Sequence, residues 1–575
     1  MTRLDTDFLE FLTTAAEARA KALLDGYRDH LTELRDLGRA RSTGRALRTL
    51  TSVHVHDAAA YHHAEDLLGP MTELAEALAE EQLDNGLWFE QGGTGSPPDT
   101  AFTIADLNIT YHLLDEDGHP PTAGIRATVE NILRKAGPGL ATGGLHTANH
   151  RWLVCAALAR IHRRWPDPAY PERIDAWLAE GIDQLPGGEY SERSPTYSAV
   201  VTNPALLLLA RNYGRSDLYA NVRANLEAGL YLTEPDGELE SVHSRRQDQT
   251  TARHLPEFWL QYREMAIHDG DGRFAAVARL LRERGAGQRM GETPLGDRLA
   301  QILDQPELGR LLPESAELPT DFEHHDDSCR LVRVRRGRST ASVFGGTDVP
   351  HTHAISSGLS SNPTFFKFRK GEAILDSLRL APQFFSLGHF RSEGLERRGD
   401  AWRLHAELRA AFHHPLPAAH RRPDGDYALT DDGRFWSAMD FPHRPKDYCT
   451  LSTEVVLREV REAGGGAWDI DVDLTGSAAP FTVELCFRRG GTLTGEGLEP
   501  VAGETDTYHL VSGEATYTVG GDHITFGPGN GKGGKQPPVV DAGERYAWLG
   551  GSLPVDGVRV LITGRSPSSY RLILR

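Results

Sequence analysis

The stretch GPGLATGGLHTANH, from Gly137 to His150, is a glycine-rich polar loop between two segments of helical periodicity. Three more glycine-bearing loops lie in the same half of the chain: DNGLWFEQGG (from Asp84), LPGGEYSERSPTY (from Leu185) and EPDGELESVHSRRQ (from Glu234). The loops follow one another at steps of 58, 44 and 49 residues, measured between Gly86, Gly144, Gly188 and Gly237. Because about fifty residues hold two helices and their connections, the sequence predicts a repeat of helix pairs.

Repeated helix pairs form either an open solenoid or a closed (α/α) toroid. The four loops fall at the same phase of the repeat, so we expect them to gather on one face, as they would around the cleft of a toroid. Apolar residues recur at helical spacing from about residue 5 to 315, as in MTELAEALAEEQL at 71–83. The N-terminal half is therefore predicted to be an (α/α) toroid.

The second half of the chain has a different periodicity. From about residue 329, alternating or β-branched runs such as LVRVRRGRSTASVFGG and WDIDVDLTG are separated by turns rich in Gly, Asp and Pro. The prolines and acidic residues of LPESAELPTDFEHHDD suit a linker. We predict an α+β multidomain protein with a toroid at 1–315, a linker at 316–328 and an antiparallel β-sheet or sandwich domain at 329–575.

Composition limits the classes of partner. The 575 residues include 81 acidic and 62 basic ones, and the net charge of −19 excludes nucleic acid and anionic membranes as general partners. The four cysteines have no CxxC spacing, which favours buried thiols over a zinc ribbon or a disulfide framework. The first residues lack the basic start and unbroken apolar run of a signal peptide, and no later segment approaches a membrane span. We expect a soluble, cytoplasmic protein.

The first two loops carry residues that suit either structure or chemistry. Trp88, in a polar loop beside a glycine, could stack on a sugar ring or pack in the interior. Ser96 is expected to cap a helix that begins at Pro97. Asn149 could also cap a helix, but capping does not explain His150, whose neutral imidazole is favoured near the positive end of the helix dipole and can accept a proton.

The third and fourth loops add further candidates. Tyr190 and Tyr197 lie beside Glu192 and Arg193, and a nearby cation favours ionisation of a tyrosine, although packing alone would also explain both tyrosines. The fourth loop concentrates polar and basic groups that could equally be a solvated turn. These groups are His243, Arg245, Arg246, Gln247 and Asp248.

Two motifs resemble the heparinase II/III-like polysaccharide lyases and their alginate lyase relatives. The first is the Asn149-His150 step at a helix start, followed about 45 residues later by Glu-x-Ser-Pro-x-Tyr, which is Glu192, Ser194, Pro195 and Tyr197. The second is GGTDVPHTHAISSGLSSNPTFFKFRKGEAILDS, which is similar to the first β-domain signature of the family: a His-x-His pair, a strand, a Gly turn and a second strand ending in Asp. Its members here are His351, His353, Gly371 and Asp376.

The resemblance implies cleavage of the bond to O4 of a uronic acid by β-elimination, with a 4,5-unsaturated uronate as product. Asn149 and His150, or a nearby Arg, would stabilise the charge that develops on the uronate. Tyr197 would be the acid, and also the base when both groups lie on one side of the sugar; the alternative base is His150, His243 or His351. The implied substrate-binding residues are Trp88, Tyr190, Glu192, Arg245, Arg246 and Gln247.

The chemistry implied by the resemblance needs no cofactor, but metal-bearing members of the family hold a structural zinc in the β domain. The corresponding ligands here would be His353, Asp376 and His389, with His405 as the alternative to His389. Without a signal peptide, such an enzyme would act on imported, anionic uronate oligosaccharides, for example those containing glucuronate.

Two other functions fit the same residues. A glycoside hydrolase on the same toroid would use two carboxylates, such as Asp99 with Glu192 or Asp248. A non-catalytic protein would bind uronate glycans through the aromatic and basic loops without turning them over.

Overall fold

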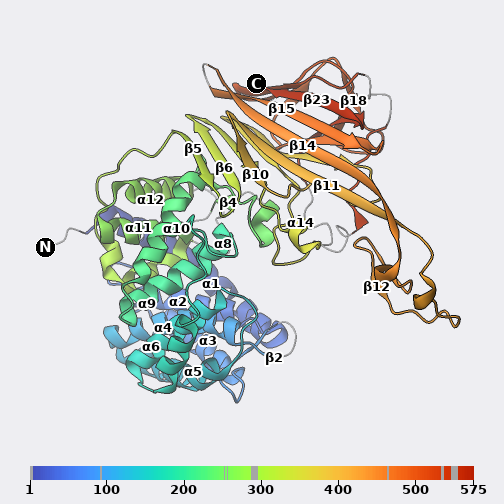
Figure 1. The fold of residues 1–575 in the computed structure, drawn as a ribbon. Coiled ribbons are helices and arrows are strands. Elements are labelled where there is room, and N and C mark those ends of the chain that lie inside the picture. The colour runs from blue at the N-terminus through green and yellow to red at the C-terminus, as the bar shows by residue number, and fades with distance from the viewer. Residues whose placement is uncertain are drawn as a thin grey trace. The chain divides into compact units, whose positions relative to one another are not determined.

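The computed structural model describes residues 4–90, 94–250, 253–254, 257–285, 295–462, 465–531, 537–544 and 555–575. They form two compact units, one helical and one built of strands (Figure 1). Unit 1 comprises Met1–Ser191, Pro195–Leu239 and Arg253–Leu318, and unit 2 comprises Glu192–Ser194, Glu240–Ala252 and Pro319–Arg575. Two short loops of the helical half therefore group with the strands.

Unit 1 consists of helices with a few two-residue strands in the loops. The helices are α1 (Thr6–Leu37), α2 (Ala40–Val55), η1 (Glu65–Leu67), α3 (Leu68–Glu80), α4 (Pro97–Asp117), η2 (Pro120–Thr122), α5 (Ala123–Thr142), α6 (His150–Arg164), α7 (Ala169–Leu178), α8 (Pro195–Tyr197), η3 (Ser198–Thr202), α9 (Asn203–Asn212), α10 (Leu218–Leu232), η4 (Gln247–Thr250, in unit 2), α11 (Glu257–Asp269), α12 (Gly272–Gly285), η5 (Leu295–Arg298), α13 (Leu299–Asp304) and η6 (Pro306–Gly309). The short strands are β1 (Phe89–Glu90), β2 (Thr94–Gly95), β3 (Glu238–Leu239) and β4 (Arg253–His254).

Polar side chains set the register between helices one repeat apart. Two ion pairs, Arg41 with Asp99 and Arg48 with Asp106, join α2 to α4, and the partners of each pair are 58 residues apart. A constant separation along two helices means that they run parallel, with their C-terminal ends together. Arg163 of α6 donates to Asn212 of α9, 49 residues later. These separations confirm the predicted repeat.

The last helix returns to the first ones and closes the array. The buried carboxylate of Asp304, at the end of α13, accepts hydrogen bonds from Arg160 of α6 and, at 2.7 Å, from the imidazole of His112 in α4. In η5, the element just before α13, Asp297 accepts a hydrogen bond from the hydroxyl of Thr49 in α2 at 2.8 Å. The array is therefore a closed toroid, as predicted, and the open solenoid is excluded.

Helix ends follow the local signals in part. Ser96 accepts a hydrogen bond from the backbone N–H of Asp99, with Pro97 as the first residue of α4, so the predicted cap is confirmed. Among the described helices, none is long and apolar enough to cross a bilayer.

Unit 2 contains two large sheets. Its strands are β5 (Asp321–Asp326), β6 (Leu331–Arg336), β7 (Ser339–Phe344), β8 (Phe366–Lys370), β9 (Ala373–Pro382), β10 (Leu395–Arg398), β11 (Ala401–His413), β12 (Thr430–Asp431), β13 (Trp436–Ser437), β14 (Lys446–Glu462), β15 (Gly465–Gly476), β16 (Pro480–Phe487), β17 (Thr492–Thr494), β18 (Leu498–Pro500), β19 (Thr507–Leu510), β20 (Ala515–Val519), β21 (Asp522–Gly527), β22 (Val558–Arg565) and β23 (Ser568–Leu574). Three short helices connect them: α14 (Val349–Thr352), η7 (Ala418–His420) and η8 (Phe441–His443).

The nine-stranded sheet has the order β18-β19-β22-β16-β9-β8-β7-β6-β5, and the eight-stranded sheet has the order β10-β11-β14-β15-β23-β21-β20-β17. Their inner faces share one apolar core. Phe366 of β8 meets Trp468 of β15 edge-on at 5.1 Å between ring centroids, and Phe487 of β16 lies 4.9 Å from Phe526 of β21. The unit is therefore the predicted sandwich. Its ladders are antiparallel except for the parallel pair of β19 with β22.

Two details differ from the sequence prediction. The predicted linker at 316–328 contains β5, an edge strand of the nine-stranded sheet, because its side chains alternate between exposed and half-buried positions. Asp376 was expected at the end of a strand, but it lies in the middle of β9; the turn before it is at Gly371, as predicted, with φ of +58°.

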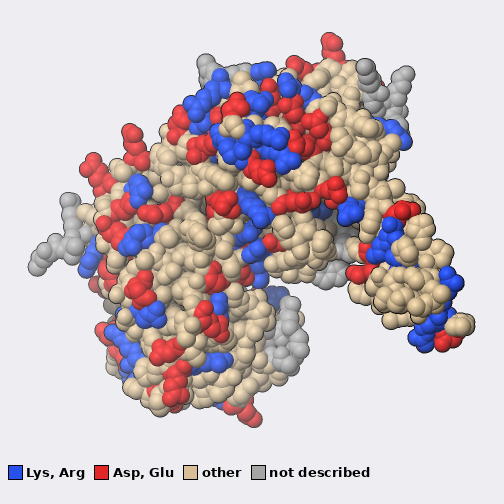
Figure 2. All heavy atoms as spheres, viewed as in Figure 1, with Lys and Arg blue, Asp and Glu red and all other residues tan. Residues whose placement is uncertain are grey.

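Charges of both signs are interleaved on the visible face over β14 and β15 (Figure 2). Much of this pattern consists of cross-strand ion pairs, including Arg403 with Glu454 and Arg571 with Asp471. Such pairs compensate one another locally, so the net charge of −19 is not concentrated on that face.

We predict that Asp304→Asn lowers the free energy of unfolding of the helical unit by about 3–5 kcal/mol, because the substitution leaves the buried guanidinium of Arg160 without its counter-charge. Thermal and urea melts followed by circular dichroism test this. Asp217→Asn, at a carboxylate whose side chain is 60% exposed, is the matched control and should cost less than about 1 kcal/mol.

The ion pair of Asp304 with Arg160 also predicts that the stability of the helical unit depends on pH. Burial opposes the charge on Asp304, but Arg160 and His112 hold the pKa of this carboxyl well below its usual range. A carboxyl whose pKa is depressed on folding contributes stability above its unfolded pKa and loses that contribution as the pH falls. From about pH 5 downward, the wild type should lose more stability than Asp304→Asn; parallel loss in the two proteins would contradict the assignment.

Candidate active site

The first residues of α6 form a small polar cluster in unit 1. Nδ1 of His150 lies 2.7 Å from the hydroxyl of Thr147, and the same hydroxyl lies 3.5 Å from Oδ1 of Asn149. Asn149 is 2% exposed and makes no side-chain cap hydrogen bond to α6, so the capping interpretation of this residue is wrong. The amide is instead held among side chains at the helix start.

The next two residues anchor α6. Arg151 donates to Glu180 and Asp183, and the indole N–H of Trp152 donates to the same oxygen of Asp183 at 3.2 Å. Trp152 is fully buried, and the guanidinium of Arg151 lies over its ring at 4.5 Å. These contacts fix the position of the helix start, and with it the imidazole of His150.

The two tyrosines of the third loop have different environments. Tyr190 is 3% exposed, and its hydroxyl donates to Oδ1 of Asn203 at 2.7 Å. Burial raises the pKa of Tyr190 well above its usual range. This environment favours the packing alternative for Tyr190 over substrate binding, because its side-chain hydroxyl is hydrogen-bonded inside the helical unit.

Tyr197 is half-buried and ends the short helix α8. It directly precedes η3, a π-helical segment that packs against α6, the helix that begins at His150. Wide helical turns of this kind are uncommon and often lie at functional sites. Tyr197 thus stays a candidate, and the segment that follows it packs against the helix that begins at His150.

Trp88 does not offer a face to a sugar. The indole is 2% exposed, and its N–H donates to the carbonyl oxygen of Leu78 at 3.0 Å. The burial of the indole in unit 1 favours the packing alternative over the predicted stacking role.

In unit 2, the loop that starts at Glu240 is pinned to the nine-stranded sheet. The carboxylate of Glu240 accepts hydrogen bonds from Ser342 of β7, from Lys367 of β8 at 3.0 Å and from the backbone N–H of Val242. It also lies 3.5 Å from the guanidinium of Arg333 in β6. Burial opposes ionisation, but Lys367 and Arg333 hold the pKa of Glu240 well below its usual range. Arg333 lies between two core valines in β6, so strand alternation turns it to the opposite face of the sheet.

The basic residues of the fourth loop are engaged in ion pairs. Arg245 donates from two nitrogens to the two oxygens of Asp348, each at 2.8 Å, and Arg246 donates to Glu192 at 2.9 Å. Burial opposes the charge on Asp348, but the hydrogen bond from Arg245 lowers the pKa of that carboxyl. The predicted basic pocket is thus compensated: Arg245 clamps the loop, and Glu192 offsets the charge of Arg246.

The carboxylates proposed for a hydrolase also have partners. Asp248 accepts from the hydroxyls of Ser194, at 2.8 Å, and Ser244. Asp99 accepts from Ser96 and pairs with Arg41. These carboxylates serve as structural acceptors, which disfavours the two-carboxylate mechanism.

The remaining candidates of unit 2 differ in exposure. His243 is fully buried, whereas Gln247 and His351 are exposed. Nε2 of His351 lies 2.8 Å from a guanidinium nitrogen of Arg330, and because a guanidinium has only donors, this ring nitrogen is the acceptor.

The predicted zinc ligands do not fit a metal ion. Both oxygens of Asp376 accept from Arg488, at 2.9 and 2.7 Å. His389 is buried beside Glu484, with 3.9 Å between Nε2 and Oε2, and the alternative ligand His405 lies near Glu393. Among the described residues, His353, Asp376 and His389 do not come within ligand distance of one another. The described residues therefore do not support the predicted zinc site.

Several important partners were missed from the sequence. Asp348 lies 103 residues from Arg245, and Thr147 has no motif of its own. Asp183, the partner of Arg151 and Trp152, could have been suspected from the sequence because it lies just before the third glycine loop.

Solved structures with the same fold are polysaccharide lyases. The chain matches a xanthan lyase of Paenibacillus with a TM-score of 0.56 at 11% identity, covering 98% of this chain and 57% of that one. It matches the Streptomyces coelicolor A3 chondroitin AC lyase, in complex with chondroitin sulphate, with a TM-score of 0.52 at 13% identity, covering 99% and 79%. It matches heparinase III with a TM-score of 0.52 at 9% identity, covering 92% of this chain and 76% of that one. The sequence itself matches no known family and no curated protein. The likeness confirms the predicted fold, a toroid followed by a β domain.

We predict that Arg245 and Asp348 are coupled by about 2 kcal/mol in a double-mutant cycle with Arg245→Met and Asp348→Asn, because the bidentate pair is mostly withdrawn from water. Thermal melts of the four proteins measure the coupling. The exposed pair of Arg489 with Asp556 is the control and should give a much weaker coupling. Equal coupling in the two pairs would show that Arg245 does not clamp the loop.

Proposed function

We propose that this chain, which has the polysaccharide lyase fold, cleaves the glycosidic bond to O4 of a uronic acid residue by β-elimination. The observation that carries the proposal is the polar start of α6, where Thr147, Asn149 and His150 lie together. The substrate class is a uronate-bearing glycan. Chondroitin sulphate, which the Streptomyces enzyme binds in its structure, is one such polymer.

The difficult step in this reaction is removal of the proton from C5 of the uronate. The electron pair of the C5–H bond becomes the C4–C5 double bond, the C4–O4 bond breaks, and O4 leaves with a proton. Charge builds on the carboxylate in the transition state, so hydrogen-bond donors aimed there stabilise the transition state more than the ground state.

Asn149 and His150 are suited to hold that carboxylate. Nδ2 is the donor group of the Asn149 amide, and Oδ1 is the atom near Thr147. If the hydroxyl of Thr147 donates to Nδ1 of His150, Nε2 carries the proton and becomes a second donor. The N-terminal end of α6 adds partial positive charge at the same place.

Tyr197 is assigned to proton transfer. A phenolate can take the C5 proton, and the phenol so formed can give the same proton to O4 when both groups lie on one face of the sugar. Asn149, His150 and Tyr197 all belong to unit 1, so the proposal does not depend on the ion-paired arginines of unit 2.

We predict that Tyr197→Phe lowers kcat on uronate oligosaccharides by about 10³-fold while KM changes little, because only the proton-transferring hydroxyl is lost. The ultraviolet absorbance of the unsaturated uronate product measures the rate. Tyr27→Phe, which loses an exposed hydroxyl on α1, should be as active as the wild type. Wild-type activity in Tyr197→Phe would remove Tyr197 from the mechanism.

We predict that His150→Ala lowers kcat by about 10²–10³-fold with an unchanged melting temperature, as expected for loss of one donor to the developing charge. His150→Gln separates the two roles of this residue, because glutamine can donate a hydrogen bond but is not a base. Partial activity in His150→Gln supports the donor role. Equal loss in both variants would assign the base to His150 instead.

A further inference from the structure

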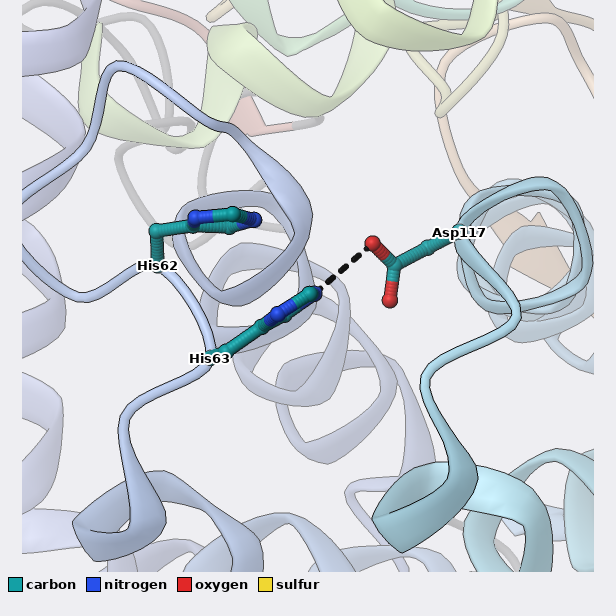
Figure 3. A group of neighbouring side chains, drawn as sticks. All are labelled: His62, His63 and Asp117. Carbon is teal, nitrogen blue, oxygen red and sulfur yellow. Dashed lines mark hydrogen bonds and ion pairs between the residues drawn. The ribbon is translucent and has the colours of Figure 1, made fainter.

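A group of imidazoles and one carboxylate lies in unit 1 at the C-terminal ends of two parallel helices. His62 and His63 lie in the turn after α2, and Asp117 is the last residue of α4 (Figure 3). One nitrogen from each histidine and one carboxylate oxygen all lie within 4.8 Å of one another. Nε2 of His63 is 2.9 Å from Oδ1 of Asp117.

From this arrangement we propose that His62, His63 and Asp117 bind a divalent transition-metal ion, of which zinc is the type tested below. Two imidazoles and a carboxylate are a ligand set that zinc accepts, and a tetrahedral site with bonds of about 2.1 Å places ligand atoms about 3.4 Å apart. The upper limit of 4.8 Å on the separations between the ligand atoms is compatible with this value. A water molecule would complete the coordination.

Backbone geometry supports a dedicated site. His63 has a φ of +53°, a left-handed conformation that is unfavourable for a residue with a side chain, and its N–H donates to the carbonyl oxygen of His54 at 2.9 Å. This bond fixes the turn to the end of α2 and points two consecutive histidines toward α4. The carboxylate is also oriented, because its other oxygen accepts from the N–H of His119 at 3.3 Å.

Two further histidines pack behind His63. The ring of His119 stacks on that of His63, with 3.9 Å between centroids and an angle of 7° between planes. His119 is in turn hydrogen-bonded, Nδ1 to Nε2 at 3.3 Å, to the fully buried His54. Outer partners that fix the orientation of a ligating imidazole are typical of metal sites and raise their affinity.

The helix ends favour a cation at this place. The C-terminal ends of α2 and α4 both carry partial negative charge toward the group, and Gly118, at φ of +63°, ends α4 immediately after Asp117. A metal ion here would join the turn after α2 to the end of α4. These are the two helices whose register is set by Arg41 with Asp99 and Arg48 with Asp106.

The proposed site is separate from the candidate active site. The ring of His150 lies 6.3 Å from that of Phe102, in the first turns of α4, whereas Asp117 ends the same helix. Fifteen residues of helix span about 22 Å. The metal is therefore assigned a stabilising role in the toroid, which does not depend on the proposed function.

A second group of the same composition provides the control. In unit 2, His420, Asp440 and His443 also lie within ligand distance, but His443 is 53% exposed and no further histidine layer supports it among the described residues. The experiment is therefore done in a His443→Ala background, which leaves one group intact.

The test is equilibrium dialysis of the chelator-treated full chain against Zn²⁺, with metal analysis and thermal melts. The His443→Ala protein should bind one Zn²⁺ per chain, and Zn²⁺ should raise its melting temperature. Adding His62→Ala should abolish both effects without changing the melting temperature of the metal-free protein. Adding Asp117→Asn should abolish the binding of Zn²⁺. His63→Asn, which tolerates the left-handed backbone, should do the same.

Two results would overturn the site: no Zn²⁺ bound by the His443→Ala protein, or the same binding after His62→Ala is added. Activity separates this proposal from the previous one. His62→Ala should keep the uronate-cleaving activity of the wild type, so loss of metal binding and loss of catalysis are independent outcomes.

Discussion

The carboxylate of Asp304 is the contact on which the helical unit depends. It joins the last helix of the array to the ends of α4 and α6, through His112 and Arg160, and so closes the toroid. Closure fixes α6 in the array, and the anchoring of Arg151 and Trp152 on Asp183 then fixes the first residues of that helix. The polar start of α6 is thus held by contacts that take no part in the proposed reaction.

The repeat of helix pairs and the change to strands could be predicted from the sequence because both are periodic. Glycine loops mark the repeat, and the ion pairs between α2 and α4 show the same separation of 58 residues as the first step between loops. The sandwich follows from alternation, as Val332 and Val334 face the core while Arg333 faces Glu240. Local chemistry also placed the cap at Ser96.

The site was predicted less well because side-chain partners far apart in the sequence leave no periodic signal. Asp348 engages Arg245 across 103 residues and Arg488 engages Asp376 across 112, so two groups expected to meet substrate or zinc are engaged in ion pairs instead. The exposure of aromatic residues in glycine loops was also hard to predict. Trp88 and Tyr190 looked accessible, but each hydrogen-bonds inside the helical unit.

What remains is a chain with the polysaccharide lyase fold in which an amide, an imidazole and a phenol from the helical unit are proposed to eliminate O4 from a uronate. Elimination and hydrolysis differ in whether water enters the product. The most direct measurement is mass spectrometry of the products formed from a uronate oligosaccharide in water enriched in the heavy isotope of oxygen. The account predicts fragments whose masses sum to that of the substrate, with no heavy oxygen incorporated. Fragments that together gain one water, carrying the heavy isotope, would contradict it.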